Sequence, residues 1–269
     1  LMSGVTYAQS ARIAKELGPF SGYKKNEKPF LRVLAKHRDA ANAIEKIGVP
    51  EGLLQSAVRS WDETLELAKE YGIRNAQISV LAPTGTIAFL MDCDTTGIEP
   101  DIALVKYKWL VGGGMMKIVN STVPLALRTL GYNAEDCDSI LDYIDKNNTI
   151  EGAPKLKDEH LSVFDCAFKA KKGKRFIHYM GHVKMMGAVQ PFLSGAISKT
   201  VNMPENATAD EIAQVYSEGW KLGLKAIAIY RENSKRSQPL TTSLKEVSSK
   251  DKAVKAEVLR PKRHKLSDE

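Results

Sequence analysis

The chain has 269 residues, and its 43% hydrophobic and 26% charged residues lie near the averages for globular proteins. This length allows one large α/β unit or two ordinary domains, and no apolar run approaches the roughly 18–20 residues of a membrane span, so we expect no membrane partner. Of the net charge of +7, residues 231–269 carry +5 through 11 basic and 6 acidic residues, so the nearly neutral remainder lacks the basic surface of a nucleic-acid-binding protein.

The cysteine content indicates a reducing environment. Cys93, Cys137 and Cys166 are an odd number without any C-x-x-C spacing, which disfavours a disulfide scaffold and a structural zinc site. We therefore expect a cytoplasmic protein in which Cys137 and Cys166 are small core residues. Residue 1 is Leu and no signal-peptide pattern follows it, so we interpret the sequence as a fragment.

Three helices are predicted before residue 75, over residues 5–17, 30–47 and 60–71. The first and third are expected to end at Gly18 and Gly72, because glycine readily adopts the left-handed conformation that closes a helix. The third helix is predicted to start at Ser60, since Ser60 and Glu63 have the spacing of a capping box.

The pattern around three histidines does not indicate a metal site. His37 lies between two basic residues on the second predicted helix, and we expect an exposed face there, with a ligand or anion contact as the alternative. His178 and His182 are four residues apart, as in a helical metal site, but a glycine lies between them and no carboxylate completes the ligand set. We expect no metal site.

The most informative pattern lies between residues 75 and 100. Residues 77–81 read as a buried strand that stops at Pro83, residues 84–86 form a Thr-Gly-Thr turn, and an apolar run from Ile87 can open a helix. Free backbone N–H groups and the positive end of the helix dipole make such a turn a binding site for an anion such as phosphate. An ordinary strand–turn–helix corner is the alternative, because the chain has no Walker motif.

Beyond residue 100 the pattern continues to alternate between helix and strand. Helices are predicted over 123–130, with Thr122 as N-cap, and over 133–144 and 183–189. A βαβ unit is then predicted, with a strand over 198–203, a helix that starts from a capping box at Thr208, and a strand over 226–230. Gly112, Gly113 and Gly114 are interpreted as a hinge, a place where a bulky ligand approaches the backbone, or a plain loop. Residues 241–269 are expected to be a polar linker or tail.

Several segments, taken together, resemble the catalytic subunit of adenosylcobalamin-dependent (class II) ribonucleotide reductase. They are PTGTI at 83–87, GIEP at 97–100, VGGG at 111–114, VNSTVPLALRTLGY at 119–132, VQPFLSGAISKTVNMP at 189–204 and WKLGLKAIAIYRENSKRSQPL at 220–240. None of these segments is persuasive alone, but their order and spacing are specific, and the resemblance covers nearly the whole chain.

The resemblance implies a ten-stranded α/β barrel whose C-terminal part is residues 1–240, followed by the polar segment 241–269. In this family a cysteine thiyl radical, generated with adenosylcobalamin, abstracts the 3′ hydrogen of a ribonucleotide, and the 2′ hydroxyl leaves as water. The resemblance further implies a thioredoxin-like or dithiol reductant, a dNTP or ATP effector bound by the N-terminal part outside this sequence, and a homodimer.

The resemblance also assigns candidate site residues. The substrate-phosphate turn carries over to Pro83, Thr84, Gly85, Thr86 and Ile87, in agreement with the anion site inferred from the turn itself. For Cys93 we expect structural packing, with a redox or cobalamin-proximal role as the alternative. The glycines at 112–114 are candidates for the loop that faces the corrin.

None of the three cysteines lies in the family's Asn-x-Cys-x-Glu radical motif. The resemblance therefore implies that this chain contains no catalytic residue and that the isolated fragment is inactive. Two other functions stay open at this point: the large subunit of an oxygen-dependent (class I) reductase, and a non-catalytic nucleotide-binding module that keeps the phosphate turn.

Overall fold

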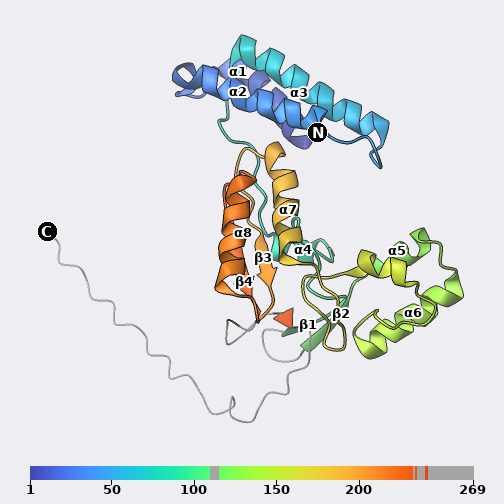
Figure 1. The fold of residues 1–269 in the computed structure, drawn as a ribbon. Helices are drawn as coiled ribbons and strands as arrows, with labels where there is room; N and C mark the ends of the chain where they lie inside the picture. Colours follow the sequence, from blue (N-terminus) through green and yellow to red (C-terminus); the bar gives the residue numbers. More distant parts are fainter. Residues whose placement is uncertain (110–114, 233, 235–239, 242–269) are drawn as a thin grey trace, which may run out of the picture.

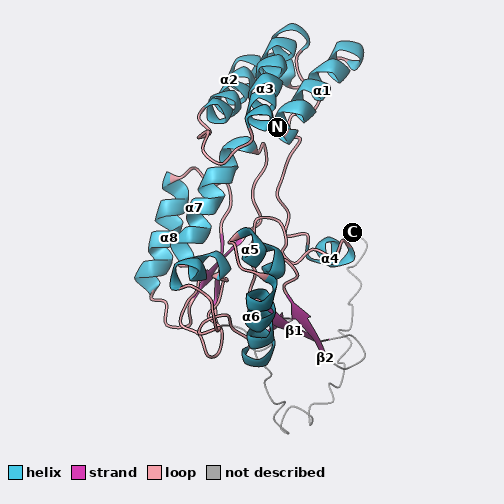
Figure 2. Cartoon of the chain, turned by 90° about the vertical axis from the view of Figure 1, so that its right-hand side faces the viewer, coloured by secondary structure: helices cyan, strands magenta, loops and turns pink. Residues whose placement is uncertain are grey.

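The computed structural model describes residues 1–109, 115–232, 234 and 240–241. Three buried hydrophobic clusters divide them into a helical part (residues 1–76), a central part (77–100 and 178–232) and a lobe (101–177 with 240–241). Figure 1 shows the helical part at one end of the central part and the lobe beside the other end. Extended segments connect the helical part to the rest of the chain in Figure 2.

The helical part consists of α1 (Met2–Leu17), α2 (Tyr23–Asn42) and α3 (Glu51–Tyr71). Its core is built from large side chains that are almost fully buried, chiefly Tyr7, Leu34, Trp61 and Ile73. The predicted ends of the first and third helices are confirmed, because Gly18 and Gly72 close them with φ of 75° and 73°.

The predicted start of the third helix at Ser60 is wrong. α3 already begins at Glu51, after Pro50, and Ser60 lies buried in its middle, where its hydroxyl donates to the carbonyl of Ala57. The hydroxyl of Thr64 donates to the backbone of Gly4 in α1. Packing between α1 and α3 therefore extends the helix through a sequence that would also suit a helix start.

The central part contains the predicted βαβ unit. Strand β3 (Thr200–Met203) pairs in parallel with β4 (Ala228–Arg231), and α8 (Ala209–Lys221) connects them. The capping box at the start of α8 is confirmed, with reciprocal contacts between Thr208 and Glu211. Helix α7 (Tyr179–Val189) packs against α8 and β3, and the short η2 (Gln190–Phe192) leads towards the helical part.

The buried strand predicted over residues 77–81 is wrong, because this segment forms an isolated bridge and no regular strand, and it is not buried. Residues 78–81 run parallel to residues 195–198 through a single bridge, Leu81 to Ile197, and the side chain of Val80 is 64% exposed. The hydroxyl of Ser194 accepts from the backbone N–H groups of Ile78 and Ser79 at 2.9 and 3.0 Å. Within the described residues this segment thus pairs with residues 195–198 along one edge, and the side of the segment that carries Val80 is open to solvent.

The lobe combines a small antiparallel sheet with helices. The sheet has the strand order β2-β1-β5 and is built from β1 (Val105–Trp109), β2 (Met115–Val119) and β5 (Leu240–Thr241). Strand β5 includes Thr241, the first residue of the predicted polar tail, and the remaining tail residues, 242–269, lie outside the described residues. The helical elements are α5 (Val123–Thr129), α6 (Ala134–Asn147) and η1 (Asp158–Phe164). The predicted helices here are confirmed, although the hydroxyl of Thr122 donates to Asn120 instead of capping α5.

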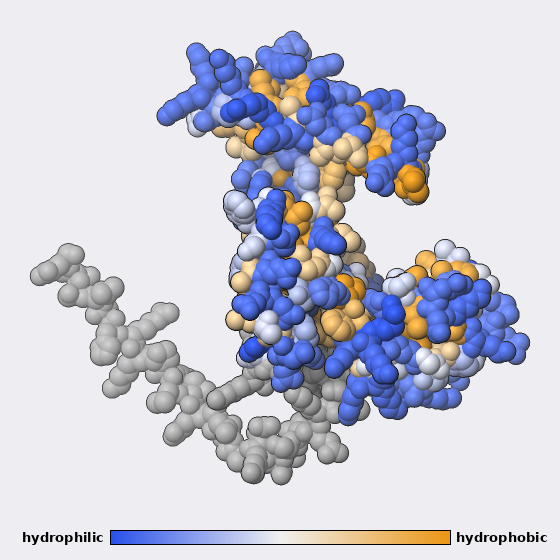
Figure 3. Space-filling model, in the orientation of Figure 1, coloured by the Kyte–Doolittle hydropathy of each residue, from blue (hydrophilic) through white to orange (hydrophobic). Residues whose placement is uncertain are grey.

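The mixed α/β class is confirmed, but the described residues do not form a closed barrel. Their strands make a three-stranded and a two-stranded sheet, and Figure 3 shows an open hollow between the helical part and the lobe. In the described ranges no helix combines the length and apolar character needed to cross a membrane.

Replacing Gly195 by Ala should destabilise the protein, by about 1–3 kcal/mol, because an added Cβ would lie 2.7 Å from the carbonyl oxygen of Ser79. That carbonyl also accepts a hydrogen bond from the Gly195 N–H, so the two backbones cannot separate without losing it. Calorimetric melting of the full-length protein measures the effect. Gly52→Ala is the control, since nothing surrounds a Cβ at this helical position and its melting temperature should be unchanged or higher; equal melting temperatures of the two variants would contradict the account.

Candidate functional site

The candidate phosphate turn lies at the start of α4 (Gly85–Leu90), directly after the open segment 78–81. Thr84 precedes the helix, and its carbonyl accepts from the N–H of Ala88 at 2.8 Å. By helix geometry the N–H groups of residues 85–87 have no acceptor within the helix. Thr86 and Ile87 are exposed, and nothing lies within 4 Å of a Cβ built on Gly85. Among the residues that the structure describes, these N–H groups have no hydrogen-bond partner, so the turn can offer them to a ligand.

Thr84 adopts a left-handed backbone conformation with φ of 50°. A β-branched residue is seldom found there, and such a conformation costs about 1–3 kcal/mol. Residues held in this way gather at ligand-binding turns, so the geometry of Thr84 agrees with a binding role for the turn.

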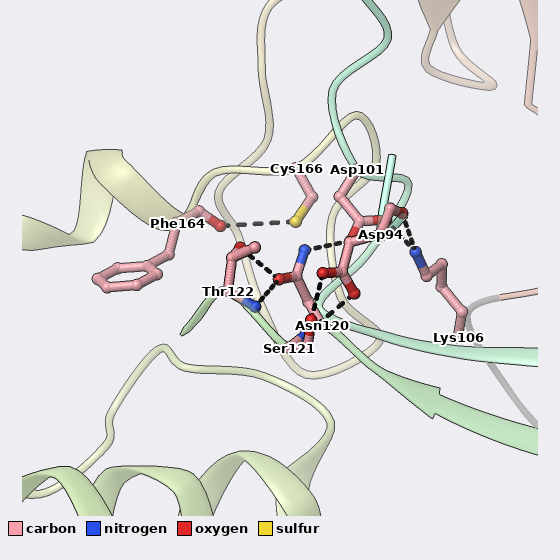
Figure 4. Close-up of polar contacts among 8 residues, drawn as sticks. All are labelled: Asp94, Asp101, Lys106, Asn120, Ser121, Thr122, Phe164 and Cys166. Atoms are coloured by element: carbon pink, nitrogen blue, oxygen red, sulfur yellow. Dashed lines mark hydrogen bonds and ion pairs between the residues drawn. The ribbon is translucent and has the colours of Figure 1, made fainter. Parts of the chain in front are cut away.

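The chain after α4 is anchored on the lobe (Figure 4). The carboxylate of Asp94 accepts from the N–H and hydroxyl of Ser121 at 3.0 and 2.6 Å. The ammonium of Lys106 donates to the carbonyl of Asp94 at 2.9 Å and to Asp101 at 2.7 Å, in an ion pair whose side chains are only 7% and 8% exposed. Asn120 donates to the second oxygen of Asp101 at 2.7 Å, so every charged oxygen in the cluster has a partner.

A second anchor joins the same connection to the central part. One oxygen of the Glu99 carboxylate accepts from the N–H of Thr200 at 2.8 Å, and the other accepts from the ammonium of Lys199 at 2.8 Å. The Lys199 side chain is 1% exposed, and its ammonium also contacts the carbonyl of Thr200 at 2.7 Å and Nδ1 of His182 at 2.8 Å. Three acceptors, from the connection after α4, from α7 and from β3, thus meet at one buried cation.

The electrostatics of this network follow from burial. Burial, and then the positive charge of Lys199, lower the pKa of His182 from 6.5 to about 4. Burial also lowers the pKa of Lys199, while Glu99 opposes that change. Neutral His182 accepts through Nδ1, so its proton lies on Nε2, which is buried and has no partner within the described residues.

His178 and His37 both have structural contacts in the fold. His178 does not pair with His182; its Nδ1 accepts from the N–H of Met180 and caps α7. The predicted exposure of His37 is wrong, because His37 is buried, stacks on Trp61 with ring centroids 5.0 Å apart, and hydrogen-bonds the carbonyl of Pro191. Burial lowers the pKa of His37, which favours its neutral form. His37 thus connects the helical part to the central part through its hydrogen bond to Pro191.

The cysteines provide no reactive pair. Cys137 and Cys166 are buried, as their packing role predicted, and burial, followed by the charge of Asp101, raises the pKa of Cys166 to about 12. Cys93 is exposed, so its predicted packing role is wrong. The three glycines at 112–114 lie outside the described residues.

Sequence reasoning missed the network around Lys199. Glu99 and Lys199 occur in two of the motifs that carry the resemblance, but neither was given a role. They are 100 residues apart in the chain. The available signal was that Lys199 alternates with the apolar residues Ile197, Val201 and Met203, because a lysine on a buried side of a strand requires a paired acceptor.

Comparison with known proteins gives a consistent result. The family model described as the barrel domain of ribonucleotide reductase matches residues 1–230. A vitamin B12-dependent ribonucleotide reductase of Rhodopirellula baltica is 57% identical over 275 residues, covering 100% of this chain and 26% of the relative. Its namesake in Streptantibioticus cattleyicolor is 50% identical, covering 99% and 44%. A vitamin B12-dependent ribonucleoside-diphosphate reductase of Mycobacterium tuberculosis is 33% identical, covering 63% and 23%.

The chain therefore belongs to the ribonucleotide reductase family and is part of its barrel domain. It spans 26% and 44% of the length of the first two relatives, so each of them is much longer than this chain. The resemblance inferred from the motifs is confirmed. Since these relatives are named as dependent on vitamin B12, an oxygen-dependent class I subunit is not favoured.

Replacing His182 by Asn should make stability less dependent on pH. The folded pKa of about 4 lies below the ordinary 6.5, so the unfolded state binds more protons between these values. Stability contributed by neutral His182 is complete above about pH 6.5 and is lost as pH falls towards 4, by up to about 3 kcal/mol.

Asn keeps an oxygen that can accept from Lys199 but does not titrate. Urea unfolding of the full-length protein at about pH 7 and about pH 5 should show a smaller difference in the variant than in the wild type. The pKa of His37 is also lowered, and its contribution is common to both proteins. An equal loss of stability on acidification would refute the assignment.

Proposed function

We propose that this chain is part of a ribonucleotide reductase that converts ribonucleotides to 2′-deoxyribonucleotides by thiyl-radical chemistry initiated by adenosylcobalamin. Its own contribution is the substrate-phosphate turn: Pro83, Thr84, Gly85, Thr86 and Ile87. The observation that carries the proposal is the open turn before α4, with free N–H groups, an exposed Thr86 and a left-handed Thr84, in a chain of this family.

The chemistry of the turn suits a phosphate. N–H groups and the positive end of the helix attract the anion, and hydroxyls of Thr84 and Thr86 can donate further hydrogen bonds. Holding the phosphate fixes where the ribose lies relative to a reactive group elsewhere in the enzyme, which is the positioning contribution to catalysis. The turn thus binds and orients the substrate.

The residues present do not fit the radical-forming role. Cys166 is buried and protonated, Cys137 is buried, and exposed Cys93 lacks the flanking Asn and Glu of the radical motif. We therefore assign no radical step to this chain. Adenosylcobalamin, the radical cysteine and the site for a dNTP or ATP effector belong, in this proposal, to the rest of the enzyme.

We assign residues 1–240 to the C-terminal part of a ten-stranded barrel and residues 241–269 to a polar segment. The open face of residues 78–81 and the parallel pair β3 and β4 support this assignment, since parallel strands linked by helices are the units of such a barrel. Exposed apolar side chains near the turn, including Val80, Leu90 and Met91, provide surface for further barrel elements. The complete enzyme would be a cytoplasmic homodimer reduced by a dithiol or thioredoxin-like protein.

Replacing Thr86 by Val in the full-length enzyme should raise KM for the ribonucleotide about tenfold, because one hydrogen bond to a charged phosphate is lost. The measurement is steady-state reduction of ribonucleoside diphosphates and triphosphates with adenosylcobalamin and a dithiol. Thr129→Val is the matched control, since Thr129 is exposed on the lobe and its hydroxyl donates to the carbonyl of Leu125 within α5. A wild-type KM in the Thr86 variant would refute the phosphate site.

A further inference from the structure

The place of the phosphate turn depends on the segments on either side of it. On the N-terminal side, the N–H of Leu81 donates to Ala196 at 3.3 Å and the carbonyl of Leu81 accepts from Ser198 at 2.8 Å. On the C-terminal side, the turn is followed by the six-residue α4 and then by an irregular connection to β1, residues 91–104. This connection needs its own anchors if the turn is to keep one position.

The connection folds back onto the residue before the turn. Gly97 has φ of 54°, and a Cβ built on it would lie 2.9 Å from the carbonyl oxygen of Ala82. Gly97 and Ala82 are therefore in close backbone contact, with the turn enclosed between them in the chain. A shift of Gly97 towards Ala82 must therefore displace Ala82 or the turn.

Two residues further on, Glu99 fixes the connection to β3. Its carboxylate uses both oxygens, one on the N–H of Thr200 and one on the ammonium of Lys199, each at 2.8 Å. Because Lys199 is buried, its charge requires this anionic partner; the other two acceptors, His182 and the Thr200 carbonyl, are neutral. The anchor is therefore both directional and difficult to replace.

We propose that Glu99 is a positioning residue for substrate binding: anchored on Lys199 and Thr200, it holds the connection and thereby sets the position of the phosphate turn. The inference rests on the proposed phosphate site and extends it to a residue that need not touch the substrate. A glutamine at this position keeps an oxygen for the N–H of Thr200 but turns an amide donor towards the ammonium of Lys199.

The test is a double-mutant cycle in the full-length enzyme. Glu99→Gln should raise KM for the ribonucleotide about tenfold, with a much smaller change in kcat, because the bound phosphate loses alignment with its donors. If Glu99 acts through the turn, combining Glu99→Gln with Thr86→Val should raise KM less than the product of the two single effects. A rise of about a hundredfold, the independent result, would overturn the proposal.

Controls separate this inference from the proposed site and from general destabilisation. Glu151→Gln alters a carboxylate in the lobe that accepts from the backbone N–H groups of Lys174 and Arg175, and it should leave KM unchanged. An equal KM rise in that control would overturn the positioning role. A wild-type KM in Glu99→Gln beside a raised KM in Thr86→Val would overturn only the inference, whereas a wild-type KM in Thr86→Val would overturn the phosphate site and the inference with it.

Glu99→Asp provides a second variant if Glu99→Gln does not fold. It keeps the negative charge beside Lys199 but shortens the reach by one methylene, so the connection must shift to keep its contacts. KM should rise several-fold in the folded protein. A wild-type KM in folded Glu99→Asp would likewise overturn the proposal.

Discussion

A buried ammonium, that of Lys199, is the constraint on which the arrangement of the central part depends. A charge with a side chain only 1% exposed is unfavourable unless each of its donors has an acceptor. Those acceptors come from three places: Glu99 in the connection after α4, His182 on α7, and the backbone of β3 at Thr200. Satisfying one cation therefore fixes a loop, a helix and a strand relative to one another.

The candidate phosphate site combines a local geometry with two distant anchors. The turn itself contributes free N–H groups and a left-handed Thr84, which a short segment can encode alone. Its position, however, depends on Glu99 at β3 and on Asp94 at the lobe, where Ser121 donates two hydrogen bonds. In the proposed function binding and chemistry are therefore separate, because the phosphate is assigned to this chain and the radical chemistry to residues elsewhere in the enzyme.

Local signals in the sequence predicted local structure, and long-range contacts caused the failures. The capping box at Thr208 and the closing glycine at 72 act within one turn of helix, so single-sequence reasoning identified both. Ser60 has equally good local chemistry, but packing of α3 on α1 overrides it. The buried polar groups of His37 and Lys199 find their partners, the carbonyl of Pro191 and the carboxylate of Glu99, 154 and 100 residues away in the chain, and no local pattern encodes such contacts.

In the proposed enzyme the turn before α4 holds the phosphate of the substrate while Glu99 keeps the turn in place. A structure of the full-length enzyme with a bound ribonucleotide tests it most directly. We expect phosphate oxygens within about 3 Å of the backbone nitrogens of residues 85–87, with Glu99 still bound to Thr200 and Lys199. Phosphate bound away from this turn, or a bound state in which Glu99 has left β3, would contradict it.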